Sequence, residues 1–92
     1  MAKVYSGYFY KVPKYKDTSE LNINRTDNFD DVVEEINRSC ERAAKLGYHN
    51  DEKWLIVLVE YQSVYDDDGV FCSSWRNETA IALYDNGTVT EF

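Results

Sequence analysis

Residues 29–46 read Phe-Asp-Asp-Val-Val-Glu-Glu-Ile-Asn-Arg-Ser-Cys-Glu-Arg-Ala-Ala-Lys-Leu and form the one segment of the 92-residue sequence with clear helical periodicity. Acidic residues fill its first turns and basic residues its last, which suits the helix dipole. Gly47 follows as a typical C-terminal stop signal. The pattern predicts a helix over Phe29–Leu46, capped by Asp27 or Asn28. Its apolar stripe recurs every three or four residues, at Phe29, Val33, Ile36, Cys40 and Ala43/Ala44.

The segments on either side of this helix show strand patterns. Lys3–Val12 alternates aromatic and β-branched residues, and Pro13 favours its end because proline cannot donate to a strand ladder. Trp54–Tyr65 begins as a continuous apolar run, which is typical of a central strand under a helix. Three further strand-like segments follow: Val70–Trp75, Thr79–Tyr84 and Thr88–Phe92. The first two are either separate strands or one long strand with an irregularity at 76–78, and Asn86-Gly87 predicts a type I′ hairpin turn.

These elements predict an α+β fold, with one amphipathic helix packed on an antiparallel sheet of about four to five strands. The expected order along the chain is β-α-β-β-β(-β). The length of 92 residues indicates one compact domain over residues 1–92. No apolar run is long enough to span a membrane, and the first residues lack a signal-peptide core. We therefore expect a cytoplasmic protein with no membrane partner.

The net charge of −7 is unevenly distributed along the sequence. Residues 1–25 carry five basic and two acidic groups, whereas residues 26–92 carry five basic and fifteen acidic groups. An acidic surface disfavours direct binding to a phosphate backbone and favours a protein partner with a basic surface. The acidic residues concentrate at the predicted helix start and at the turn after the central strand: Asp30, Asp31, Glu34, Glu35, Asp66, Asp67 and Asp68.

No catalytic or metal-binding constellation emerges from the residues that carry chemistry. Asp66-Asp67-Asp68-Gly69 resembles part of a calcium loop, but Asn77 stands where such a loop needs a bidentate glutamate, so a hairpin turn is favoured. His49, the single histidine, could form a catalytic pair with Cys40 or Cys72, but the sequence offers no third group to orient the imidazole. Two cysteines and one histidine without paired spacing disfavour a zinc site. The sequence thus predicts no enzyme, no cofactor and no bound metal, with both thiols reduced.

Tyrosines are interleaved with lysines near the start of the chain. Such a pattern could stack the bases of a single-stranded nucleic acid, anchor a protein interface, or reflect ordinary cross-strand packing. The acidic balance of the chain favours the protein interface over the nucleic acid. The predicted aromatic anchors are Tyr8, Tyr10 and Trp75.

We therefore predict a small, acidic, non-enzymatic inhibitor or adaptor that binds a protein. In size and charge the chain is similar to small phage-encoded inhibitors, anti-CRISPR proteins among them. That similarity implies an anti-defence protein that blocks a basic, nucleic-acid-binding surface of its target. Two alternatives remain open. One is a nucleic-acid-binding module that uses the N-terminal Tyr/Lys-rich strand; the other is a small enzyme or metal-dependent factor that uses His49 and the Asp66–Asp68 turn.

Overall fold

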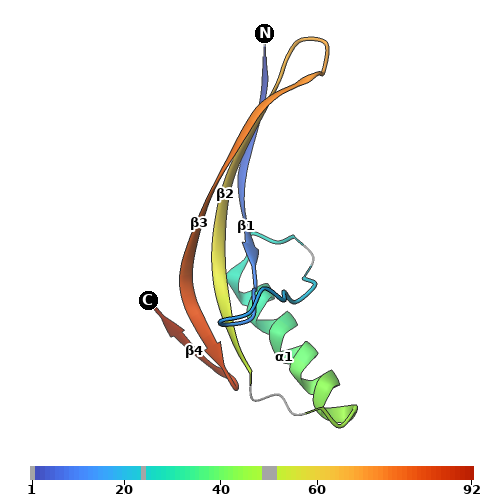
Figure 1. Cartoon of the computed structure of the whole chain (residues 1–92), viewed down its shortest axis with the longest axis vertical. Helices are drawn as coiled ribbons and strands as arrows, with labels where there is room; N and C mark the ends of the chain where they lie inside the picture. Colours follow the sequence, from blue (N-terminus) through green and yellow to red (C-terminus); the bar gives the residue numbers. More distant parts are fainter. Residues whose placement is uncertain (1, 24, 49–51) are drawn as a thin grey trace.

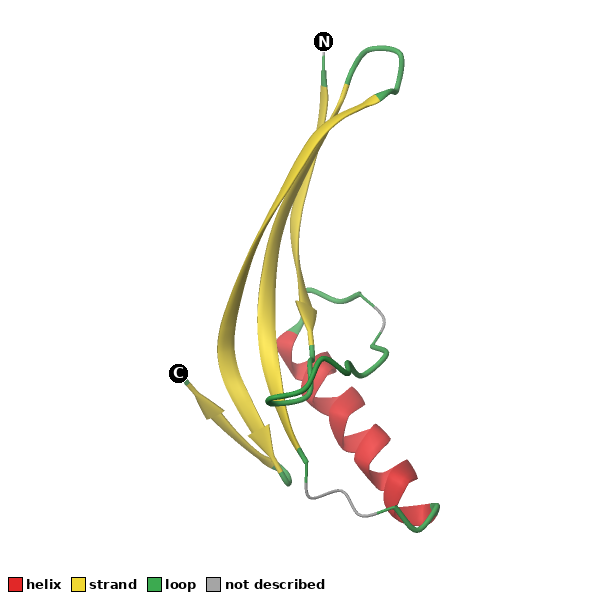
Figure 2. Ribbon diagram, in the orientation of Figure 1, coloured by secondary structure: helices red, strands yellow, loops and turns green. Residues whose placement is uncertain are grey.

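The computed structural model describes residues 2–23, 25–48 and 52–92. One helix and a four-stranded antiparallel sheet follow each other in the order β-α-β-β-β, which confirms the predicted α+β class (Figures 1 and 2). In space the strand order is β1-β2-β3-β4. No helix in the described ranges is long and apolar enough to cross a membrane. The elements are β1 (Lys3–Lys11), α1 (Phe29–Lys45), β2 (Lys53–Tyr65), β3 (Phe71–Asp85) and β4 (Thr88–Glu91).

The helix begins where its capping chemistry predicts. Asn28 is the N-cap, and its side-chain Oδ1 accepts a hydrogen bond of 2.9 Å from the backbone N–H of Asp30. The helix ends at Lys45, one residue earlier than predicted, with Leu46 as the C-cap. The backbone then turns at Gly47, whose φ of +82° lies in the left-handed region that glycine tolerates.

The face that α1 buries is rotated slightly from the predicted stripe. Val32 and Ile36 are fully buried, whereas Ala44, which was placed on the stripe, is exposed. The four-residue spacing of Val32 and Ile36 puts their side chains one above the other on the helix. The C-terminal turn of the helix therefore contributes little to the core.

The main core lies between α1 and one face of the sheet. The phenol of Tyr84 on β3 donates a 2.6 Å hydrogen bond to Asn37 Oδ1 on the helix, so even the polar end of this buried ring is satisfied. Residues that point to the other face of the sheet form a smaller cluster, in which Phe9, Val57 and Val59 are buried. The buried residues of the main core are Val12, Val32, Ile36, Trp54, Ile56, Ala82 and Tyr84.

β3 is one continuous strand, and the predicted irregularity at 76–78 is wrong. Arg76, Asn77 and Glu78 pair in regular register with Tyr61, Glu60 and Val59 of β2. The register shifts instead between Ile56 and Val57 and between Val64 and Tyr65, which leaves Ile81 and Cys72 of β3 as extra residues. Polar residues remain in the ladder at 76–78 because they are exposed, and exposure removes the cost of burying them.

The turn between β3 and β4 follows the prediction. Asn86 and Gly87 have φ values of +45° and +89°, and a type I′ turn requires a positive φ at both of its central residues. β4 is short and pairs only with the last four residues of β3, Ala82 to Asp85.

Three strands continue beyond the helix and form a projection, which we call the arm (Figure 1). It comprises residues 3–8 of β1, 60–65 of β2 and 71–78 of β3. The arm gives the molecule extents of 53 × 28 × 23 Å and a radius of gyration of 16.2 Å. A globular chain of this length has a radius of gyration of about 12 Å. The molecule is therefore elongated, with a helix-covered base and a bare arm.

Candidate protein-binding surface on the arm

Two of the predicted aromatic anchors share one face of the arm. Tyr8 lies opposite Glu60, and Trp75 lies opposite Gln62, two residues further along β2. Because side chains alternate between faces with a period of two, Tyr8 and Trp75 lie on the same side of the sheet as α1. We call this surface the helix-side face of the arm.

Both rings are oriented by hydrogen bonds while their carbon surfaces stay exposed. The Tyr8 hydroxyl donates to Glu60 Oε1 at 3.3 Å, and Trp75 Nε1 donates to Gln62 Oε1 at 3.0 Å. Tyr8 is 55% exposed and Trp75 is 47% exposed. Val4 lies on the same face and is 54% exposed. Large rings with fixed polar ends suit an interface anchor, because little side-chain entropy remains to be lost on binding.

Tyr10, the third predicted anchor, is half-buried beside the helix. Its ring packs edge-to-face against Phe29 at the start of the helix, with 5.9 Å between ring centroids, and it contacts the main core. Tyr8 and Tyr10 therefore share a strand face but differ in environment, because the helix covers only the second of them.

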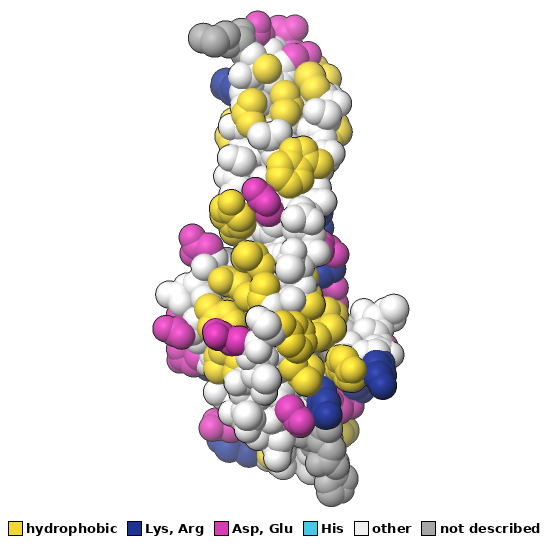
Figure 3. Space-filling model, turned by 90° about the vertical axis from the view of Figure 1, so that its left-hand side faces the viewer, with side chains coloured by type: hydrophobic (Ala, Val, Ile, Leu, Met, Phe, Trp, Pro, Cys, Tyr) yellow, Lys and Arg dark blue, Asp and Glu magenta, His cyan; other side chains and the backbone are white. Residues whose placement is uncertain are grey.

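The opposite face of the arm carries an aromatic series that the sequence analysis did not single out. The Tyr65 ring contacts Tyr5 and Phe71 edge-to-face, with centroid separations of 5.6 and 5.8 Å, respectively. A shallow depression of about 540 Å³ lies beside them and includes Tyr61 and Lys3 in its wall. Figure 3, which views the molecule from the side away from the helix, shows hydrophobic side chains from the arm to the base. The sequence contained one signal for this face, because Tyr5 and Phe9 alternate with a period of two along the first strand.

The carboxylates at the helix start are partly paired. Arg38 donates to Glu35 Oε1 at 2.7 Å and to Glu34 Oε1 at 2.9 Å, so one guanidinium bridges both carboxylates and offsets part of their negative charge. Asp30 and Asp31 in the first turn are exposed. The negative charge available at this end of the arm therefore resides mainly in the first turn.

The Asp66–Asp68 turn lies at the far tip of the arm (Figure 1). Asp66 Oδ1 accepts hydrogen bonds of 2.9 Å from the backbone N–H groups of Asp68 and Val70, so this carboxylate stabilises the turn itself. Asp67 and Asp68 are exposed. The acidic residues at the helix start and those of the Asp66–Asp68 turn do not form one continuous surface. They lie at the two ends of the arm, with Tyr8 and Trp75 between them.

Two of the lysines near the tyrosines form ion pairs with carboxylates. Lys11 forms ion pairs with Glu78 at 2.8 Å and with Glu20 at 3.7 Å. The Lys14 ammonium donates to Glu52, and this hydrogen bond raises the pKa of Lys14. Because β1 alternates, Lys11 also lies on the face opposite to Tyr8. Lys11 is thus separated from Tyr8 in space, whereas Lys3 lines the depression beside Tyr5, and Lys16 Nζ lies 5.3 Å from the ring centroid of Tyr15.

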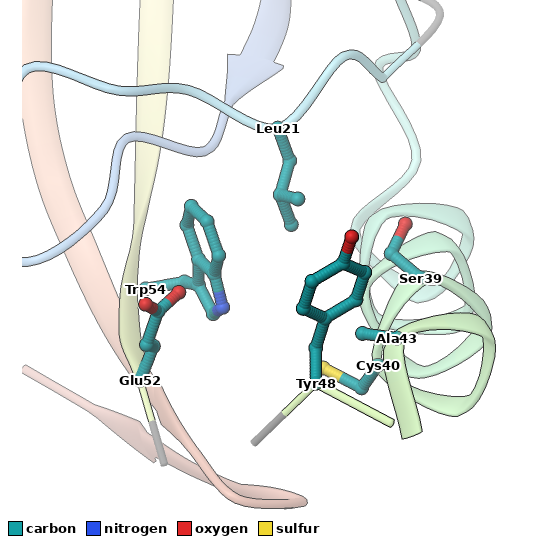
Figure 4. A pocket seen from close by; sticks show the side chains of 7 residues that line it. All are labelled: Leu21, Ser39, Cys40, Ala43, Tyr48, Glu52 and Trp54. Carbon is teal, nitrogen blue, oxygen red and sulfur yellow. The ribbon is translucent and has the colours of Figure 1, made fainter. Parts of the chain in front are cut away.

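A pocket of about 280 Å³ lies between the helix and the start of β2 (Figure 4). The buried indole N–H of Trp54 has no acceptor within the described parts of the chain. Cys40 also lines the pocket and is half-buried, whereas Cys72 is exposed on the arm; both thiols are free. The described residues that line it are Leu21, Ser39, Cys40, Ala43, Tyr48, Glu52 and Trp54. These described residues offer hydrogen-bonding groups, and among them no nucleophile is paired with an orienting base.

The metal-dependent alternative gains no support from the arrangement of ligands. Among residues 2–23, 25–48 and 52–92, no three His, Cys, Asp or Glu side chains are grouped as metal ligands. The predicted role of His49 lies outside the described residues.

No protein-family model, curated protein or solved structure matches this chain.

Proposed function

We propose that the protein is a non-enzymatic inhibitor or adaptor that binds a target protein through its arm. The observation that carries this proposal is the exposure of large apolar side chains on a sheet segment that α1 does not cover. Val4, Tyr8 and Trp75 contribute little to the main core, and an exposed aromatic surface is typical of an interaction site. Tyrosine and tryptophan are also enriched among the residues that dominate binding energy.

The acidic groups at the two ends of the helix-side face favour a target with a basic surface. Asp30 and Asp31 lie at the base of the arm, and Asp67 and Asp68 lie at its tip. Carboxylates in exposed positions accelerate encounter with a positive surface, while buried aromatic contacts slow dissociation. Where that surface normally holds nucleic acid, the carboxylates would take the place of phosphates and the arm would block access. This mode of action is the one that the similarity to small phage-encoded inhibitors implies.

The test begins with affinity capture from a lysate of the source organism and identification of the target by mass spectrometry. The purified target is then titrated with the wild-type protein and with a Tyr8→Ala/Trp75→Ala variant. We expect the variant to dissociate at least tenfold faster, which corresponds to about 1.4 kcal/mol. Tyr48→Ala is the matched control, because Tyr48 is 69% exposed and lies away from the arm.

Charge is tested separately from the aromatic contacts. Asp30→Lys/Asp31→Lys should slow association at low salt and lose this effect as salt rises, because exposed charges are screened within about 8–10 Å. Glu41→Lys, also exposed on the helix, is the control. Unchanged target binding by the Tyr8→Ala/Trp75→Ala variant would contradict the proposal. Tight binding of a single-stranded oligonucleotide that this variant loses would instead support the nucleic-acid module.

A further inference from the structure

We infer that the unpaired edge of β3 accepts an extended segment of the target protein as an additional strand. This inference rests on the proposed function, because it assumes a protein partner. It assigns that partner a binding mode, β-strand addition, in which backbone hydrogen bonds provide affinity and side-chain contacts provide specificity.

The edge in question is long and open. β4 pairs with β3 only from Ala82 to Asp85, and the backbone N–H of Phe92 donates to the Ile81 carbonyl at 2.9 Å. Within the described part of the chain, no strand pairs with the outer edge of residues 71–80. All ten of these residues are exposed. Their outward-pointing backbone groups are therefore available to a partner.

Two bulges set the length of the regular part of this edge. Cys72 and Ile81 are the extra residues, and between them β3 pairs regularly with β2 from Ser73 to Ala80. Eight residues of antiparallel strand span about 27 Å at roughly 3.4 Å per residue. Since bulges terminate or redirect pairing, we expect an added strand to occupy this interval.

Of the features that protect exposed strands from pairing, the edge contains two charged residues, Arg76 and Glu78, and the bulge at Cys72. Residues 71–80 contain no proline, glycine or lysine. The outer edge of β1 differs, because it contains Lys3 and Gly7, and its Tyr10 N–H already donates to the Thr26 carbonyl at 3.1 Å. Natural edge strands carry such features to prevent association. The absence of proline, glycine and lysine from residues 73–80, together with their regular register, favours β3 over β1 as the site of strand addition.

The surroundings of the edge define the chemistry of the occupant. Trp75 faces the helix side and offers its exposed ring to an apolar residue of the added strand. The acidic Asp66–Asp68 turn borders one end of the interval, and Glu91 borders the other. The occupant is therefore an extended peptide segment with an apolar residue near its centre and basic residues at both ends.

A second copy of this chain fits the edge less well. A two-fold arrangement centred on Asn77 would place Arg76 opposite Glu78 of the other copy, and this pair by itself would stabilise the dimer. The same register would bring the other copy's strand to Ile81, whose carbonyl already accepts from Phe92. Two chains that each carry a net charge of −7 would also repel one another.

The first test uses a synthetic peptide of alternating Thr and Val with two Lys at each end, added to the 15N-labelled protein. We expect amide shifts concentrated at residues 73–80 and at least tenfold slower hydrogen exchange there at saturation. A peptide with Glu ends should bind at least tenfold more weakly. Two further peptides carry N-methyl groups on either the Val or the Thr nitrogens, and one of the two should lose binding, because alternate N–H groups face the protein.

The second test places the strand in the same chain. β4 runs antiparallel to β3 towards the arm, so eight alternating Thr and Val residues appended after Phe92 would lie along the open edge at high effective concentration. We expect the amides of residues 73–80 to exchange at least tenfold more slowly than in a protein with a Gly/Ser extension of equal length.

Several results would overturn the inference: no protection of residues 73–80 in either test, equal binding of both N-methylated peptides, shifts at β1 instead, or concentration-dependent dimers in sedimentation. The appended strand also separates the two proposals. If the target still binds when the edge is filled, strand addition is wrong and the proposed function stands. If the edge accepts strands but Tyr8→Ala/Trp75→Ala leaves target binding unchanged, the proposed function is wrong.

Discussion

Replacement of Ile36 by alanine tests whether α1 is held on the sheet by the buried face described above. Ile36 is 0% exposed and belongs to the main core. The change removes three carbon atoms, which at about 0.8 kcal/mol per buried methylene gives roughly 2.4 kcal/mol. The cavity left behind adds to this loss, so we expect a destabilisation of about 3–4 kcal/mol. A small domain has a total stability of only about 5–15 kcal/mol, so the effect is large.

Urea unfolding followed by tryptophan fluorescence measures this change, because Trp54 lies in the same cluster. The midpoint should fall while the denaturant slope stays constant. In thermal unfolding, the midpoint should fall by roughly 12–32 °C, at about 4–8 °C per kcal/mol. Leu46→Ala is the control, because Leu46 is 68% exposed and should cost less than about 0.5 kcal/mol. A loss below about 1 kcal/mol for Ile36→Ala would refute the assigned helix face.

Three other predictions follow from local contacts. Asn28→Ala removes the N-cap and should cost about 1 kcal/mol in thermal unfolding; an unchanged midpoint would show that the cap is dispensable. Gly7→Ala places a Cβ 3.0 Å from the Tyr61 hydroxyl and should cost about 1 kcal/mol, with a smaller loss in a Tyr61→Phe background, measured by a double-mutant cycle. Burial, followed by the neighbouring Cys40, raises the pKa of Tyr84 above its ordinary value of 10.0. Its contribution to stability should therefore be complete below pH 10 and decline as the pH rises further, and Tyr84→Phe should flatten this decline in urea midpoints.

The sequence alone determined the elements whose signals are local. The helix was predicted to within one residue at its end, because its period, its Asn28 cap and the following Gly47 all act within a few residues. The turn at Asn86-Gly87 was predicted for the same reason, since the required positive φ values depend on those two residues. The order of strands and helix, and hence the α+β class, followed from these local patterns.

Only the tertiary structure decided which residues are covered. Tyr8 and Tyr10 are equivalent in the sequence pattern, yet one is exposed on the arm and the other packs against Phe29. The spacing of the acidic residues in the sequence likewise does not show how far apart they lie. The sheet places the acidic helix start and the Asp66–Asp68 turn at opposite ends of the arm. The positions of the bulges at Cys72 and Ile81 depend on the register of β3 against β2. In each case the cause is packing between segments that are distant in sequence, because the helix is shorter than the sheet and covers only its base.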